Sequence, residues 1–482
     1  MQHYPVIIIG AGPAGLTAAY QLVKQGVKPL VLEQDDKVGG IARTETYKGY
    51  RFDIGGHRFY TKVEAVTQLW QEVLGAEFIK VPRLSRIYYR GRFFNYPLDV
   101  FNTLLNLGIV ESGLILLSYL KAKLFPIAEE QTFEQWVSNR FGERLYKTFF
   151  KTYTEKVWGI PCNQIQADWA AQRIKGLSLT TAVLNALFGS NNTKTLIKEF
   201  DYPVLGPGMM WQRFAELVES QGGEVHLNTG VVSIQRQGNR IKSITAKHEG
   251  NLVEFTGDRF ISTMPVSALI NQMEPLPPAE VLEAARSLKY RDFLIVTLIV
   301  NSPNLFPDNW IYIHTPEVKV GRIQNFKNWS AALVPDPSKT CLGMEYFCNE
   351  GDPLWEMTDA QLIELASREL DTLGLAKASD VEDGSIIRQH KAYPVYDSEY
   401  RRHLQTLQGF LETVENLQTV GRNGMHRYNN QDHSMLTAML AVRNLFGEKH
   451  DLWEVNTERS YYEDFSAEQK KKTESSLSST SN

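Results

Sequence analysis

The sequence predicts an α/β protein whose main sheet is assembled from separated stretches of chain, with a helical insertion and a second, β-rich region between them. Residues 5–32 follow the order strand, glycine turn, helix and strand. Short β-type runs with turn residues between them occupy 224–265, and a further set occupies 290–350. Helical patterns dominate 64–200. A glycine-led segment near residue 420 then returns to the first layer.

Three glycines, Gly10, Gly12 and Gly15, form the pattern GxGxxG between the first strand and the first helix. The first permits a tight turn, the second lets the backbone approach a diphosphate, and the third lets the helix pack closely on the strand. Glu33 ends the second strand, where a carboxylate accepts hydrogen bonds from ribose hydroxyls. Together these features predict dinucleotide binding in a Rossmann-type domain, with the diphosphate at the positive end of the helix.

Two further glycine pairs favour FAD over NAD. Gly39 and Gly40 would let the chain pass close to the same diphosphate, and Arg43 is placed to meet its charge. Gly55 and Gly56 offer another exposed stretch of backbone. The longer FAD requires three such close approaches, whereas NAD does not. Since no second GxGxxG occurs, we expect non-covalent FAD, with NADPH only as an external reductant that visits the open site.

Changes between helical, β-type and polar patterns along the sequence divide the chain into six expected segments. They are 1–95 (FAD-binding, first part), 96–200 (helical insertion for substrate binding or oligomerisation), 201–275 (FAD-binding, second part, with a β-meander), 276–390 (β-rich substrate domain), 391–464 (FAD-binding, third part) and 465–482 (disordered tail). The tail is predicted to be disordered because it has almost no apolar residues.

Composition bounds the classes of function. With 43% hydrophobic and 22% charged residues the chain is typical of a soluble globular enzyme, and the net charge of −4 argues against nucleic-acid binding. Cys162, Cys341 and Cys348 have no metal-ligand spacing, so we expect buried free thiols, no metal site and a reducing, cytoplasmic location. The first residues are interpreted as a strand rather than a signal peptide.

The stretch from Phe101 to Pro126 is the most apolar in the insertion. It is interrupted by Asn106, Glu111, Lys121 and Lys123, whereas a membrane-spanning helix requires about 20 mostly uninterrupted apolar residues. We therefore expect a buried or amphipathic helix and no transmembrane segment. Peripheral membrane contact stays open as an alternative.

Four motifs carry a resemblance to a known superfamily. They are GGHRFY at 55–60, YTEKVWGIPCNQIQADWAAQR at 153–173, GRIQNFKNW at 321–329 and GRNGMHRYNNQDHSM at 421–435. With the glycine pattern, they resemble the FAD-binding superfamily of flavin amine oxidases, protoporphyrinogen oxidase and UDP-galactopyranose mutase, and are most similar to the mutase branch. The resemblance covers most of the chain at low to moderate similarity.

The resemblance implies roles for particular residues. Catalytic roles fall on His57, Arg173, Arg322, Arg422 and Tyr428; substrate contacts on Tyr96, Trp158, Trp329, Tyr393 and Tyr396; and flavin contacts on Val231, Gly421, Asp432, Ser434 and Met435. For His57 we expect contact with the flavin and no proton transfer. Asp432 to Met435 are expected to cap a helix whose amides face the flavin's pyrimidine edge. Trp158 has core packing as an open alternative, and Arg173 a place on a helix surface.

The activity implied by the resemblance is the interconversion of pyranose and furanose forms of a nucleotide sugar through an adduct at N5 of the reduced flavin. Arginines would clamp the substrate's diphosphate, and tyrosines would donate hydrogen bonds to it. The alternative is an oxidoreductase of the amine oxidase, protoporphyrinogen oxidase or desaturase type, with an apolar channel that residues 100–125 could line. A flavin-binding sensor without catalysis is a third hypothesis. The sugar, the nucleotide and the oligomeric state stay open.

Overall fold

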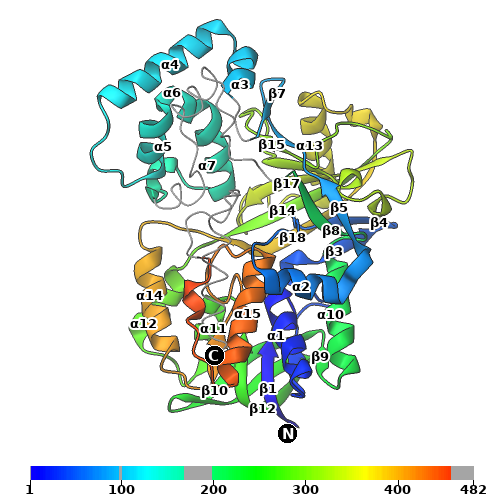
Figure 1. The fold of residues 1–482 in the computed structure, drawn as a ribbon, viewed down its shortest axis with the longest axis vertical. Coiled ribbons are helices and arrows are strands. Elements are labelled where there is room, and N and C mark those ends of the chain that lie inside the picture. The colour runs from blue at the N-terminus through cyan, green and yellow to red at the C-terminus, as the bar shows by residue number, and fades with distance from the viewer. Residues whose placement is uncertain (1, 97–99, 168–197, 457–482) are drawn as a thin grey trace.

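The computed structural model describes residues 2–96, 100–167 and 198–456. Three predictions concern positions outside these residues, namely the substrate contact of Arg173, the rest of its motif beyond residue 167, and the disordered tail at 465–482. Two large sheets dominate the described chain, and a group of helices lies at the end of the molecule opposite the N-terminus (Figure 1).

The first sheet joins three distant stretches of chain. Its parallel centre has the order β9 (Glu224–His226), β2 (Leu30–Leu32), β1 (Gln2–Ile9) and β12 (Asn251–Ser262), with β19 (Leu417–Thr419) paired to the end of β12. This confirms the predicted discontinuous α/β domain. The carboxyl ends of β1 and β12 therefore meet the glycine-rich segment that follows β19, although β1 precedes that segment by about 400 residues and β12 by about 160.

A meander extends this sheet on one side. β10 (Thr229–Gln237), β11 (Arg240–His248) and β12 pair antiparallel, and β13 (Met273–Glu274) adds to β10 in parallel. It agrees with the short β-type runs seen in the sequence.

Alternating side chains explain why both faces of the first sheet are covered. Ile8, Val31 and Ile261 pack with one set of helices, α1 (Pro13–Lys24), α10 (Gly208–Ser220) and α15 (Gln431–Leu445). Ile7 and Phe260 point the other way and pack with the opposite set, α11 (Val266–Asn271), α12 (Ala279–Ser287) and α14 (Tyr400–Leu411).

The second sheet has the strand order β18-β14-β17-β16-β15-β6-β7. Its strands are β14 (Tyr290–Val300), β15 (Trp310–Ile313), β16 (Arg322–Asn325), β17 (Thr340–Cys348), β18 (Val381–Pro394), β6 (Ser85–Tyr89) and β7 (Arg92–Asn95). It places the predicted β-rich region in one layer. The helix α13 (Asp359–Thr372) packs against it.

The limit expected at residue 95 is wrong in one respect. The hairpin β6–β7 was assigned to the first FAD-binding part, but β6 pairs in parallel with β15 and so completes the second sheet. Likewise β18 extends to Pro394, past the expected limit at 390. A local pattern shows that a strand exists but not which sheet supplies its partner, because pairing is a long-range choice.

Smaller elements link the layers. They are β3 (Thr44–Tyr47) paired with β4 (Tyr50–Asp53), the helix α2 (Glu64–Leu74), and β5 (Phe78–Pro82) paired with β8 (Glu199–Pro203). The strands β5 to β8 interrupt the region 64–200, which was expected to be mainly helical.

The helical insertion contains α3 (Val100–Leu107), α4 (Ile109–Leu124), α5 (Phe133–Phe141), α6 (Glu143–Leu145) and α7 (Thr152–Trp158). The predicted single helix at 101–126 is two helices, because Gly108 adopts a φ of +85° between them. Only Ile115 and Tyr119 of α4 are buried, so the helix is amphipathic rather than buried. Within the described residues, no helix is both long and apolar enough to cross a membrane.

Candidate cofactor and substrate site

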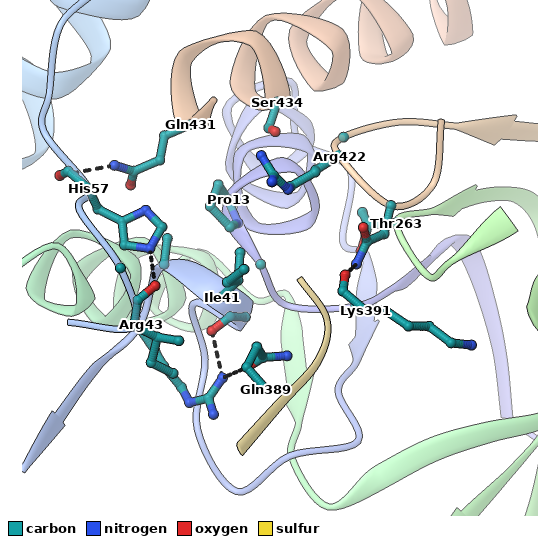
Figure 2. A pocket seen from close by; sticks show the side chains of 18 of the residues that line it. Pro13, Ile41, Arg43, His57, Thr263, Gln389, Lys391, Arg422, Gln431 and Ser434 are labelled. Carbon is teal, nitrogen blue, oxygen red and sulfur yellow. Dashed lines mark hydrogen bonds between the residues drawn. The ribbon is translucent and has the colours of Figure 1, made fainter. Parts of the chain in front are cut away.

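A single cavity of about 930 Å³ extends along the ends of β1, β2 and β12 to the face of the second sheet. It is lined by the loop before α1, the segments 33–35, 40–43 and 54–58, and parts of β10, β15, β16 and β18, together with residues of the 421–434 segment. Figure 2 shows Pro13 at the start of α1 and Ser434 in α15 facing it, with Arg422 between them. Two helix N-termini therefore meet one cavity.

The glycines predicted to approach a diphosphate face one another. A Cβ built on Gly12 would lie 3.9 Å from Cα of Gly40, and one built on Gly40 would lie 3.4 Å from Cα of Gly12. A Cβ on Gly15 would lie 1.9 Å from the carbonyl oxygen of Gly10, so this glycine is required for the helix to pack on the strand. Gly10, Gly12 and Gly40 line the cavity, whereas Gly15 does not. The bare backbone of this cradle fits a diphosphate.

Glu33 lies where the sequence placed it, at the end of β2 and on the cavity wall. Its carboxylate accepts hydrogen bonds from the backbone N–H of Ala11 (2.7 Å) and of Asp35 (3.0 Å). Burial raises the pKa of Glu33, and these amides oppose the shift. Each oxygen keeps lone-pair capacity for a ribose hydroxyl. Val231, on β10, lines the same end of the cavity.

The side chain of Arg43 lies beside the cradle formed by Gly12 and Gly40 and is held by hydrogen bonds. Its Nε donates to Glu45 (2.6 Å), and its Nη1 donates to the carbonyl of Gly40 (2.8 Å) and to Gln389 (3.1 Å). Because Glu45 shares its charge, Arg43 contributes less field to a diphosphate than the sequence suggested. Gly39 lies behind the wall, where its φ of +106° turns the chain and its N–H donates to the carbonyl of Ala11.

His57 stands between the cofactor cradle and the second sheet, next to Gly55 and Gly56. Its Nε2 lies 2.8 Å from the carbonyl oxygen of Ile54, so Nε2 carries the proton and Nδ1 is an acceptor. Burial lowers the pKa of His57 to about 4, with smaller contributions from the cationic Arg422 and Arg322. Gln431 donates to the carbonyl of His57 (3.3 Å), as Figure 2 shows. A neutral ring agrees with contact rather than proton donation.

Arg322 reaches the cavity from β16, beside Glu345 of β17. Its Nε donates to the Glu345 carboxylate, and its Nη2 donates to the hydroxyl of Tyr393 (2.9 Å). Gln324 donates to the other oxygen of Glu345 (2.6 Å). Burial alone would lower the pKa of Arg322, but Glu345 and nearby tyrosines raise it well above its usual range. The guanidinium is therefore charged and fixed in place.

Arg422 approaches the same end of the cavity from the opposite side. Its Nε donates to the carbonyl of Ala392 (2.9 Å), and its Nη1 donates to that of Asn429 (3.2 Å). Its guanidinium carbon lies 4.0 Å from the ring centroid of Tyr428 and 5.0 Å from that of Tyr393. Within the described chain no carboxylate forms an ion pair with Arg422, so the cavity retains its positive charge.

Aromatic rings form the remaining wall. Tyr96 and Tyr312 have centroids 4.9 Å apart, and Trp310 stacks on Trp329 at 5.4 Å. Tyr96 and Trp329 were predicted from the sequence, whereas Trp310 and Tyr312 were not. Both could have been recognised from the alternation of side chains along β15, because residues two apart in a strand point to the same face. Glu345, on the neighbouring β17, was missed because its role depends on pairing with β16.

Several predicted contact residues lie behind the wall. Trp158 is buried against Tyr396 (6.3 Å, stacked), whose hydroxyl accepts from the backbone N–H of Tyr428 (2.7 Å). Met435 is buried and accepts from Nε1 of Trp70 (3.1 Å). Asp432 is buried beside it. These side chains support the wall rather than face the cavity.

The expected helix cap is wrong in register. α15 begins at Gln431 with Asn430 at its N-cap, and Nδ1 of His433 accepts from the backbone N–H of Asn430 (3.3 Å). Asp432 to Met435 thus lie inside the helix rather than at its cap, and of these four only Ser434 lines the cavity, together with Asn430 and Gln431 before them. Gly421, with a φ of +85°, lines the cavity just after β19, ten residues before α15 begins. The N-terminus of α15 faces the cavity, and the contact of its amides with a flavin stays a prediction.

The three predicted thiols are buried and free. Among the described residues, no group of histidine, cysteine or acidic side chains could hold a metal ion.

Known proteins with similar sequences are named for several different activities. A probable UDP-galactopyranose mutase of Klebsiella pneumoniae is 26% identical over 176 residues, which are 35% of this chain and 44% of that protein. A putative flavin-containing monoamine oxidase of Mycobacterium tuberculosis is 25% identical over 289 residues, which are 57% of this chain and 60% of that protein. A 1-hydroxycarotenoid 3,4-desaturase of Flavobacterium is 26% identical over 284 residues, which are 53% of this chain and 56% of that protein. The chain thus spans about half the length of these curated relatives.

Solved structures extend the likeness to nearly the whole chain. A crystal structure of reduced UDP-galactopyranose mutase superposes with a TM-score of 0.82 at 22% identity, covering 94% of this chain and 98% of that one. Putrescine oxidase bound to putrescine gives a TM-score of 0.61 at 17% identity, covering 92% and 99%. These identities establish a shared fold, which is the predicted fold class. The sequence model of flavin-containing amine oxidoreductases matches residues 13–421, more than half of the chain. The protein therefore belongs to the family of flavin-containing amine oxidoreductases.

Proposed function

We propose that the cavity binds FAD non-covalently. The facing glycines Gly12 and Gly40 would hold its diphosphate, and Glu33 would accept from its ribose. Its ring system would lie toward His57 and Ser434, where the N-terminus of α15 favours negative charge. Cofactor, nucleotide and sugar would then share one continuous space.

We further propose that the enzyme is a mutase that interconverts the pyranose and furanose forms of a nucleotide sugar. The observation that carries this proposal is the convergence of Arg322, Arg422, Tyr393 and Tyr428 at one end of the cavity, beyond the cofactor cradle. Guanidinium and phenol groups bind phosphate oxygens. Arg322 shares its charge with Glu345, so Arg422 supplies the positive charge that suits a diphosphate that departs and returns, while Arg322 supplies a fixed hydrogen-bond donor. The whole-chain likeness to a mutase structure agrees with this.

The residues of the chain would act by binding and orientation. A bound reduced flavin supplies a nucleophile for the anomeric carbon. Arg422, which forms no ion pair with a carboxylate among the described residues, would stabilise the departing diphosphate, while Arg322, fixed by Glu345, would hold it in place for the return step. Neutral His57 would offer Nδ1 as an acceptor to a sugar hydroxyl. The wall of Tyr96, Trp310 and Tyr312 would exclude water and enclose the substrate.

The oxidoreductase alternative predicts an apolar channel formed by the helical insertion. Among the described residues, none between 100 and 167 lines the cavity, and the apolar side chains of α4 are mostly exposed. The positive charge and the phenols at the substrate end also suit an anion better than an amine or a polyene.

The experiment compares the two reactions on purified, flavin-loaded protein. Conversion of UDP-galactopyranose to the furanose form, followed by chromatography, should occur after reduction by dithionite or NADPH and not with the oxidised enzyme. Bleaching of the flavin by an amine or a porphyrinogen without added reductant, together with no sugar conversion, would reject the mutase in favour of an oxidase. A bound flavin with neither reaction would support the sensor hypothesis.

A further inference from the structure

The helix α4 carries an apolar surface that faces away from the rest of the described chain. Of the fifteen large hydrophobic side chains exposed in the described residues, ten lie between Leu105 and Ile127, so this surface is concentrated rather than scattered. Exposure reaches 93% for Ile109, 64% for Leu117 and 73% for Leu124. Figure 1 shows α3 and α4 at the outer edge of the molecule, at the end opposite the N-terminus.

Helical spacing places these side chains on one face. The exposed positions of α4 are Ile109, Val110, Leu114, Leu116, Leu117, Leu120 and Leu124, which recur at intervals of three and four residues. Ile115 and Tyr119 occupy the opposite face and are buried. A Cβ on Gly142 would come within 2.7 Å of the backbone N of Tyr119, so α4 is packed closely on this inner side.

The charged side chains of α4 lie at its two ends and leave the apolar surface with little negative charge. The single acid of α4, Glu111, is paired with Arg144 (2.6 Å) and so contributes little negative charge. The exposed Lys121 and Lys123 lie near the end of α4, and their spacing places them on opposite borders of the apolar face. Long lysine side chains at such borders reach toward lipid headgroups while their stems cover apolar surface.

Two further cations border the surface from the turn between β6 and β7. Arg90 and Arg92 are exposed there, and Arg92 donates to the carbonyl of Asn106 in α3. Beyond Ile127 the acidic Glu130 is paired with Arg140 (2.6 Å). Glu129, beside it, is exposed and is the one acid at this end without an ion pair among the described residues. The surface therefore combines exposed leucines with a border in which the four cations outnumber the unpaired acid.

We propose that the exposed face of α3 and α4 binds peripherally to a membrane surface that contains anionic lipids. A helix with a broad apolar face and basic borders lies in the interfacial plane, with its apolar side among the acyl chains and its cations near the headgroups. A two-fold dimer through the same face fits less well, because it would bring the same cations of both copies to one interface. The inference does not depend on the reaction in the cavity, since none of these residues lines it.

The test is flotation of the full-length, flavin-loaded protein with phosphatidylcholine vesicles, with and without phosphatidylglycerol. Wild-type protein should float with the anionic vesicles. The double variant Leu117→Gln/Leu120→Gln should bind about tenfold less, because two exposed leucines no longer enter the lipid. Lys121→Gln/Lys123→Gln should weaken the preference for anionic vesicles and the sensitivity to salt, because only Arg90 and Arg92 then remain at the border.

Leu252→Gln is the matched control, because Leu252 is 69% exposed on β12, far from α4, and should leave vesicle binding unchanged. Flavin content and thermal unfolding would show that each variant is folded. Wild-type protein that fails to float would overturn the proposal. So would a wild-type dimer that does not float and that the leucine variant converts to a monomer, since a second copy would then occupy this face.

Discussion

The guanidinium of Arg322 is bound to the carboxylate of Glu345 across two neighbouring strands, β16 and β17, whose register places these two residues opposite one another. Glu345 is buried and also accepts from Gln324, so both of its oxygens are used. The cavity thus presents an arginine whose direction is set by the sheet itself. Such pre-organisation spares the enzyme the cost of ordering a flexible side chain around its ligand.

Removal of Glu345 is expected to destabilise the protein. Glu345→Ala leaves a largely buried guanidinium without its carboxylate, and the free energy of unfolding should fall by about 3 to 5 kcal/mol. Glu345→Gln keeps an acceptor for Nε and should cost clearly less. Chemical denaturation followed by circular dichroism measures both variants. Equal losses would show that the charge of Glu345 contributes nothing to the pair.

The glycine cradle gives a test of cofactor binding. Gly12→Ala adds a methyl group where the backbone should meet the diphosphate, and Gly12 has an ordinary φ of −77° that alanine tolerates. We expect the affinity for FAD to fall at least about tenfold, with little change in the stability of the apoprotein. The ratio of flavin to protein absorbance after reconstitution measures this. The control is Gly409→Ala in α14, because the space around Gly409 is open. Unchanged flavin binding in Gly12→Ala would contradict the assignment of the diphosphate to the glycine cradle.

Arg422 gives a test of nucleotide binding. Arg422→Lys keeps a positive charge but loses the planar fork that holds the carbonyls of Ala392 and Asn429, so its charge is no longer held against Tyr428. The affinity for UDP should fall by about 10- to 100-fold. Calorimetric titration of the flavin-loaded protein measures it. Arg368→Lys, on the exposed side of α13, is the control. Equal UDP affinity in both variants would show that the diphosphate does not bind at Arg422.

Buried histidines predict a loss of stability in acid. Burial lowers the pKa of His57 and of His426 to about 4, and that of His314 to about 3. The unfolded chain, with a histidine pKa near 6.5, therefore binds more protons than the folded chain as the pH falls. Above pH 6.5 these histidines are neutral in both the folded and the unfolded state, so they do not lower the free energy of unfolding. As the pH falls from 6.5 toward 3 to 4, protonation of the unfolded chain lowers the free energy of unfolding progressively.

His314→Phe isolates one of these contributions. The ring stacks on Tyr153 with centroids 4.8 Å apart, and phenylalanine preserves a planar ring that cannot take up a proton. The midpoint of thermal unfolding should depend less steeply on pH between 6.5 and 3 in the variant than in the wild type. Burial raises the pKa of Asp53 to about 7, which acts in the opposite direction in both proteins and cancels in the difference. Parallel curves would show that His314 does not titrate on unfolding.

Local chemistry explains what sequence reasoning found. Gly10, Gly12, Gly15 and Glu33 were identified because a turn, a close approach and a strand end are encoded within about thirty residues. The positions of His57, Arg322 and Arg422 on the cavity wall agree with the motifs that contain them. Trp310, Tyr312 and Glu345 were missed because their strands gain an inner and an outer face only once the second sheet is assembled.

The sequence by itself determined the glycine turn, the strand–helix–strand order that follows it and the return of a distant segment near Gly421, because each depends on backbone freedom and on the spacing of apolar residues nearby. Tertiary structure alone decided that the hairpin β6–β7 joins the second sheet and that Trp158 lies behind the cavity wall. It also decided that the apolar face of α4 points outward. The physical reason is the same in all three cases. Strand pairing and burial depend on elements that lie far apart in the chain. A local pattern therefore cannot specify which partner an apolar or hydrogen-bonding face will meet.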